Sequence, residues 1–166
     1  MVSGAVMIGF AVAVILLQFE LAPARSISSS TTNVEQLGRA LIEHGQSLTT
    51  YTMQLPELRL IRAAHGPEQA RSVREALVAA IGASLPDAVL AGSRSGDAYI
   101  ALSVAPPETP SVIEHIREEY AERVPHVDGA DTSSLVVDRQ VITDLPGLLG
   151  ALSTLRSRHP QRMVSP

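Results

Sequence analysis

The sequence contains no cysteine, no lysine and no tryptophan. Without cysteine the chain can form neither disulfides nor thiolate metal sites, and it offers no cysteine for lipidation. All 13 basic residues are therefore arginine, and the 17 acidic residues give a net charge of −4. Nucleic acid is not an expected partner, because phosphate binding needs a positive surface and because few aromatic side chains are present for base stacking.

The N-terminus is the most apolar part of the chain, with no charged residue between Val2 and Phe19. Roughly 20 apolar residues span a bilayer, so we predict a transmembrane anchor over residues 1–21, with residues 2–19 in contact with lipid. Two alternatives remain open. Ala22-Pro23-Ala24 has the form of a signal-peptide cleavage site, although no side-chain positive charge precedes the run. A buried core helix would be apolar on every face, which a small domain covers with difficulty.

Charge and composition divide the rest of the chain. Arg25 follows the apolar run and no arginine precedes it, so the positive-inside rule predicts a single-pass protein of the inner (cell) membrane with its domain in the cytoplasm. Residues 22–32 are rich in serine and threonine and are predicted to be a linker. Residues 33–158 are long enough for one domain with its own core, and residues 159–166 are predicted to be a flexible tail.

Hydrophobic periodicity and turn residues predict the elements of this domain. In order, they are a helix capped by Thr32 or Asn33, a strand over 48–55, helices over 57–64 and 68–81, strands over 88–92 and 98–104, a helix through 112–124, a strand near 135–142 and a helix over 145–158. Gly66-Pro67 separates the second and third helices, and residues 93–97 form a hairpin turn. The fold class is therefore α/β (an α+β sandwich), a βαββαβ-type sheet with helices packed on at least one face.

Two motifs in this order resemble a GGDEF domain, the fold of diguanylate cyclases, and the resemblance covers roughly residues 33–158. The hairpin turn Ser95-Gly96-Asp97-Ala98-Tyr99 is similar to Gly-Gly-Asp/Glu-Glu-Phe of that family. The segment Gln54-Leu55-Pro56-Glu57-Leu58-Arg59-Leu60-Ile61-Arg62-Ala63-Ala64-His65-Gly66-Pro67 aligns without a gap with Asp-x-Asp-x-Phe-Lys-x-Ile-Asn-Asp-x-x-Gly-His. The resemblance implies a nucleotidyl-cyclase-like sheet.

The departures from the family pattern concern its chemistry. In the family, the first Asp and an acidic residue of the turn hold two Mg²⁺ ions, which prefer carboxylate ligands. Gln54 stands in place of that Asp and Ala98 in place of the Glu of the turn, so that Asp97 alone remains. Arg62 replaces an Asn that contacts the guanine nucleotide, and the Arg of the inhibitory Arg-x-x-Asp is missing near 84–87. The resemblance thus implies no catalytic residue, no metal, no cofactor and no enzyme activity.

Four residues are candidates for ligand binding: Arg59, Arg62, Arg94 and Asp97. Arg59 takes the place of the family's Lys, which suggests a phosphate contact. The alternative is that the arginines are ordinary surface residues and that Asp97 is only a turn former, in which case Asp97→Ala should cost at most about 1 kcal/mol. The five histidines show no spacing typical of metal ligands.

Two functional hypotheses follow. In the first, the chain is a non-catalytic, membrane-tethered interaction module, an accessory or regulatory subunit of a membrane protein assembly. In the second, it is a nucleotide-sensing or weakly nucleotide-processing degenerate GGDEF domain. An exposed apolar patch on the sheet or on the 33–48 helix favours the first. A basic cleft around Arg59 and Arg62 favours the second.

Overall fold

The computed structural model describes residues 31–104, 109–128, 130–132 and 134–156. In chain order its elements are α2 (Thr31–Glu43), β1 (Leu48–Gln54), α3 (Leu58–Ser84), β2 (Val89–Gly92), β3 (Ala98–Ser103), α4 (Thr109–Arg123), β4 (Val136–Ile142) and α5 (Leu145–Arg156). Between α2 and α5 the order is βαββαβ, which confirms the predicted arrangement of strands and helices.

The four strands form one antiparallel sheet in the order β2-β3-β1-β4. α3 leads from β1 to β2 across β3, and α4 leads from β3 to β4 across β1, so the sheet contains two interleaved βαβ units. In the pairing of β1 with β3, the last residue of β1, Gln54, lies opposite the first residue of β3, Ala98. This register brings the end of β1 beside the turn that precedes β3.

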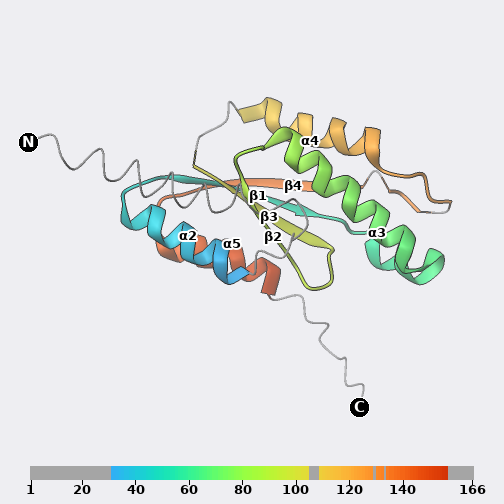
Figure 1. Ribbon diagram of the computed structural model, residues 1–166, viewed down its shortest axis with the longest axis horizontal. Coiled ribbons are helices and arrows are strands. Elements are labelled where there is room, and N and C mark those ends of the chain that lie inside the picture. Colours follow the sequence, from blue (N-terminus) through green and yellow to red (C-terminus); the bar gives the residue numbers. More distant parts are fainter. Residues whose placement is uncertain (1–30, 105–108, 129, 133, 157–166) are drawn as a thin grey trace, which may run out of the picture.

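Helices cover both faces of the sheet: α3 and α4 lie on one side, and α2 and α5 on the other (Figure 1). Alternate residues of each strand point to opposite faces. Tyr51 and Tyr99 therefore pack in the core under α3 and α4. Ile100 and Leu102 pack in the second core, under α2 and α5. The prediction of helices on at least one face is confirmed, and the molecule is a three-layer sandwich.

Two predicted boundaries near the N-terminus are wrong. α2 already includes Thr31 and Thr32, so the last two residues of the predicted 22–32 linker are helical and neither Thr32 nor Asn33 caps the helix. Threonine is only mildly unfavourable in a helix, and burial of the face that carries Val34 and Leu41 outweighs that preference.

The predicted break between the second and third helices is present as a kink. Gly66 has φ 87° and ψ 174° inside α3, a backbone conformation that favours glycine, and Pro67 follows it. α3 then continues to Ser84, three residues beyond the predicted end at 81. The helix thus has a first segment over 58–65 and a second segment over 67–84.

Within the described ranges, no helix combines the length and the apolar character needed to cross a membrane. The predicted anchor with its lipid-facing run 2–19 lies outside the described residues. So do residues 22–30 of the linker, the last two residues of the helix predicted to end at 158, and the tail 159–166.

Candidate functional site

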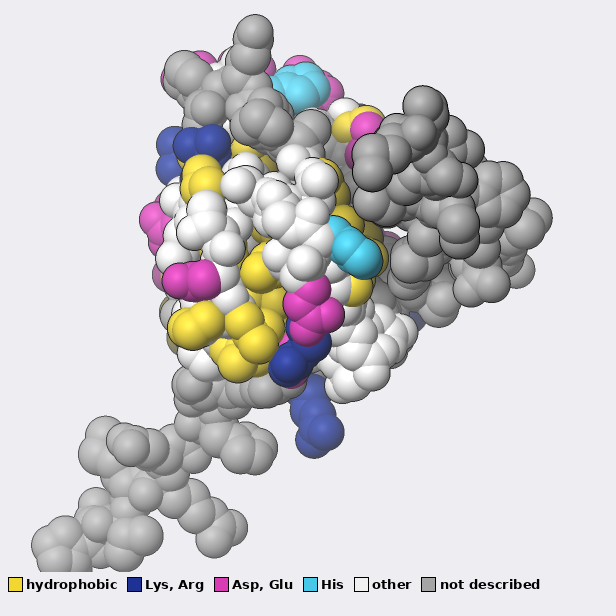
Figure 2. Space-filling view, turned by 90° about the vertical axis from the view of Figure 1, so that its left-hand side faces the viewer, with side chains coloured by type: hydrophobic (Ala, Val, Ile, Leu, Met, Phe, Trp, Pro, Cys, Tyr) yellow, Lys and Arg dark blue, Asp and Glu magenta, His cyan; other side chains and the backbone are white. Residues whose placement is uncertain are grey.

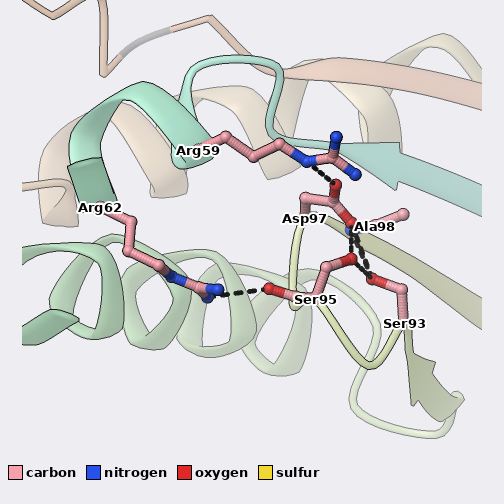
Figure 3. Close-up of polar contacts among 6 residues, drawn as sticks. All are labelled: Arg59, Arg62, Ser93, Ser95, Asp97 and Ala98. Atoms are coloured by element: carbon pink, nitrogen blue, oxygen red, sulfur yellow. Dashed lines mark hydrogen bonds and ion pairs between the residues drawn. The ribbon is translucent and has the colours of Figure 1, made fainter. Parts of the chain in front are cut away.

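The candidate site is the turn between β2 and β3, residues 93–97, together with the first segment of α3 (Figure 3). The two lie close together because β1 pairs with β3 and the chain leaves β1 directly into α3. The backbone N–H of Leu55 donates to the carbonyl of Asp97 at 2.8 Å, which joins the exit of β1 to the turn. The sheet register alone therefore places both GGDEF-like motifs side by side.

The turn is closed by its own hydrogen bonds. The Ser93 N–H donates to the carbonyl of Ala98 at 2.8 Å, and the Gly96 N–H donates to the carbonyl of Ser93 at 3.0 Å. The Ser93 hydroxyl also accepts from the Ala98 N–H at 3.1 Å. Gly96 has φ 72°, in the left-handed region where glycine carries no steric cost. A glycine is therefore required at this point of the turn.

Asp97 is buried, with 4% of its surface exposed. One carboxylate oxygen, Oδ1, accepts from the Ser93 hydroxyl at 2.9 Å and from the Ser95 hydroxyl. The other, Oδ2, lies 3.4 Å from Nε of Arg59. Burial raises the pKa of Asp97, but the hydrogen bonds from Ser95, Ser93 and its own backbone, with the charge of Arg59, outweigh burial and hold the pKa below its ordinary value. Asp97 is thus an ionised carboxylate whose oxygens both have partners.

Three of the four predicted site residues come together, and the fourth does not join them. Arg59 pairs with Asp97, and Arg62 donates from Nη2 to the carbonyl of Ser95 at 3.0 Å. Arg94 is exposed in the same turn, and no hydrogen bond or ion pair links it to the rest of the described chain. The expectation that Asp97 is only a turn former is incomplete, because its side chain also links the turn to α3.

Two features of the site were not predicted from the sequence. Ser93, Ser95 and Asp97 alternate along the turn, and this alternation was a signal that the two hydroxyls could reach one carboxylate. Arg74, on the second segment of α3, lies against Gly96, where an added Cβ would come within 2.6 Å of its Cδ. No pattern in the sequence connects Arg74 with the turn, because this contact depends on how α3 packs on the sheet.

The donor set at this site is poor for a divalent cation. Gln54 and Ala98 lie opposite each other at the ends of β1 and β3, so neither of these positions supplies a carboxylate. Across the residues that the structure describes, no group of three or more His, Cys, Asp or Glu side chains could hold a metal ion. Chemically, the arrangement is one carboxylate paired with one guanidinium and hydrogen-bonded by two hydroxyls.

Comparison with known proteins gives a fold relationship. No family model matches the chain, and no curated protein sequence matches it. Its structure is similar to the crystal structure of the GGDEF domain of a protein from Pseudomonas aeruginosa, with a TM-score of 0.52 and 14% sequence identity. The match covers 77% of this chain and 89% of that domain. The chain therefore has a GGDEF-like fold.

Proposed function

We propose that this protein is a non-catalytic GGDEF-like module that acts through binding to another protein. One observation carries the proposal: the single carboxylate of the turn, Asp97, is buried and bound to Arg59 and two serine hydroxyls. In the alignment that the resemblance implies, Gln54 and Ala98 replace the other acidic ligands. Two Mg²⁺ ions and a nucleoside triphosphate would then have one carboxylate, which already has a cationic partner.

The nucleotide-sensing alternative needs free basic groups in a cleft. Arg59 is held by Asp97, and Arg62 by the carbonyl of Ser95 (Figure 3). A nucleotide phosphate would have to displace Asp97 from Arg59 and leave a buried carboxylate without its counter-charge, which is costly. This arrangement favours the interaction module over the sensor.

The surface is mixed in character. On the face shown in Figure 2, hydrophobic side chains appear between polar and charged ones. Val136 and Val141 are 42% and 51% exposed on the edge strand β4, but they point to opposite faces of the sheet and do not form one patch. Among the residues that the structure describes, no exposed large hydrophobic side chain lies on α2, and the two on β4 do not form one patch.

We also propose that the protein is a membrane-tethered accessory or regulatory subunit of a membrane protein assembly. Residues 2–19 would anchor the chain in the inner (cell) membrane as a single span, and the domain would face the cytoplasm. The apolar run followed by Arg25 supports this topology. A reporter fused after Pro166 should behave as cytoplasmic, and a mature protein that begins at Arg25 would contradict the anchor.

The catalytic part of the proposal is tested with purified full-length protein, GTP and Mg²⁺. We expect no cyclic di-GMP, and nucleotide turnover that is lost in Asp97→Ala would overturn the proposal. Nucleotide binding that persists without metal and disappears in Arg59→Ala would instead establish the sensor. Isolation of the protein from its native membrane, with identification of the proteins that co-purify, tests the partner. Recovery of the chain alone under mild solubilisation would count against an accessory subunit.

A further inference from the structure

The first segment of α3 has little apolar attachment to the domain. Of residues 58–65, only Leu58 and Ile61 are buried, whereas the second segment of α3 buries six side chains. These six are Ala70, Val73, Ala76, Leu77, Ala80 and Ile81. Burial of a large aliphatic side chain contributes about 1.5–3 kcal/mol, so Leu58 and Ile61 hold the first segment by about 3–6 kcal/mol, less than the six buried side chains hold the second.

Helical hydrogen bonding and capping are interrupted at both ends of this segment. At its C-terminal end, Gly66 leaves the helical conformation, and Pro67 has no N–H with which to continue the hydrogen-bond ladder. At its N-terminal end, Pro56 follows the strand, and Glu57 makes no side-chain capping hydrogen bond. The segment is thus a short helix between two backbone discontinuities, which is the kind of element that opens locally before the rest of a domain.

The 93–97 turn contacts both sides of the kink. Arg59 and Arg62, on the first segment, contact Asp97 and Ser95. Arg74, on the second segment, packs against Gly96. The turn therefore holds the first segment at a fixed angle to the second, and the polar contacts of this attachment come from two arginines of the first segment.

We propose that residues 56–66 form a hinged strap, and that Arg59 and Arg62 act as a clasp that holds it closed against the hairpin turn. Release of the clasp lets the strap swing about Gly66 and exposes the buried side chains of Leu58 and Ile61. In this role Arg59 is an internal counter-ion of Asp97. The domain gains an element with a closed and an open position, and the contacts of the turn with Arg59 and Arg62 shift the equilibrium toward the closed one.

The absence of cysteine from the chain allows a direct test. In the full-length protein, the thiol of Ile61→Cys reports opening of the strap, because Ile61 is 1% exposed. The thiol of Ile116→Cys, at a 0% exposed position on the core-facing side of α4, reports opening of the whole core. Each reporter is combined with Arg59→Met and Arg62→Met together, and alkylation rates are measured under native conditions. Arg94→Met, an exposed arginine of the same turn, is the matched control.

We expect the arginine double variant to raise the alkylation rate of Ile61→Cys at least about tenfold and to leave that of Ile116→Cys unchanged. Arg94→Met should change neither rate. No increase at Ile61→Cys would overturn the proposal, and so would an equal increase at both reporters, which means global unfolding. If the double variant does not fold, Arg62→Met is measured alone, because it leaves Arg59 in place as the counter-ion of Asp97. A rise of roughly threefold confined to Ile61→Cys is then expected, and no rise would overturn the clasp.

Discussion

Replacement of Asp97 by alanine measures what the buried carboxylate contributes to the stability of the domain. The side chain is 5% exposed, and its removal deletes the partner of Arg59 and the acceptor of the Ser93 and Ser95 hydroxyls. A hydrogen bond to a charged group contributes about 1.5–3 kcal/mol. The pair with Arg59 contributes less, about 1 kcal/mol or below, because that guanidinium is 57% exposed and screened by solvent.

The serine hydroxyls are only half-buried and can turn to water when the carboxylate is lost, so these contributions are not additive. We therefore expect Asp97→Ala to lower the free energy of unfolding by about 2–3 kcal/mol, more than the 1 kcal/mol of an ordinary turn residue. Asp97→Asn should cost about half as much, since its amide oxygen still accepts from the serines. The measurement is chemical denaturation of the purified chain, followed by circular dichroism.

Asp138→Ala is the control, because Asp138 is exposed on β4 and its removal should change the free energy of unfolding by less than about 0.5 kcal/mol. If Asp97→Ala changes the free energy of unfolding as little as this control does, the carboxylate is not a fixed part of the turn. The interpretation that Asp97 links the turn to α3 would then be wrong. Acid offers a second check. The native pKa of Asp97 lies below its ordinary value, so the unfolded chain binds more protons in acid. The stability difference between wild type and Asp97→Asn should be complete at pH 7 and shrink below about pH 4.

Two further pairs of substitutions test the packing. Gly38→Ala should destabilise the domain by about 1 kcal/mol, because the new Cβ would come within 2.7 Å of the buried Leu148 side chain. Gly150→Ala, in open space on α5, should stabilise it by about 0.5–1 kcal/mol through helix propensity alone. Tyr120→Phe should cost about 1 kcal/mol, since its hydroxyl donates at 2.7 Å to a loop carbonyl. Tyr51→Phe should be neutral or stabilising, because that buried hydroxyl has no hydrogen-bond partner in the described part of the chain. The denaturation midpoints of the two variants are compared within each pair. If the variant expected to be less stable proves the more stable of its pair, the packing described above is contradicted.

Local signals in the sequence were sufficient for the order of elements. The β-branched and aromatic residues of 48–55 and the apolar spacing through Ile116 and Tyr120 identify a strand and a helix without any tertiary information. Gly66-Pro67 and Gly96 mark a kink and a turn because few other residues tolerate those backbone angles. These features depend on residues that are adjacent in the chain, so they can be predicted from one sequence.

The start of α2 and the state of Asp97 depend on contacts between distant elements, which the sequence does not display. Thr31 and Thr32 are helical because α2 packs on the sheet and against α5. Asp97 is buried and paired because α3 brings Arg59 over the turn. Arg59 and Asp97 were each predicted as candidate ligand-binding residues, but their contact was not predicted. The ion pair between them changes the chemistry available to each.

The contact between Arg59 and Asp97 bears on metal binding and on nucleotide binding at once. A divalent cation at Asp97 would lie beside the guanidinium of Arg59, whose like charge opposes it. A phosphate at Arg59 would leave the carboxylate of Asp97 buried without its counter-ion. Arg59→Met removes the first obstacle and Asp97→Asn removes the second. If Mg²⁺ raises the melting temperature of Arg59→Met but not of wild type, and pyrophosphate binds Asp97→Asn but not wild type, then this one ion pair accounts for both exclusions. Failure of both variants to respond would mean that the ion pair between Arg59 and Asp97 is not what prevents binding of the metal or of the phosphate.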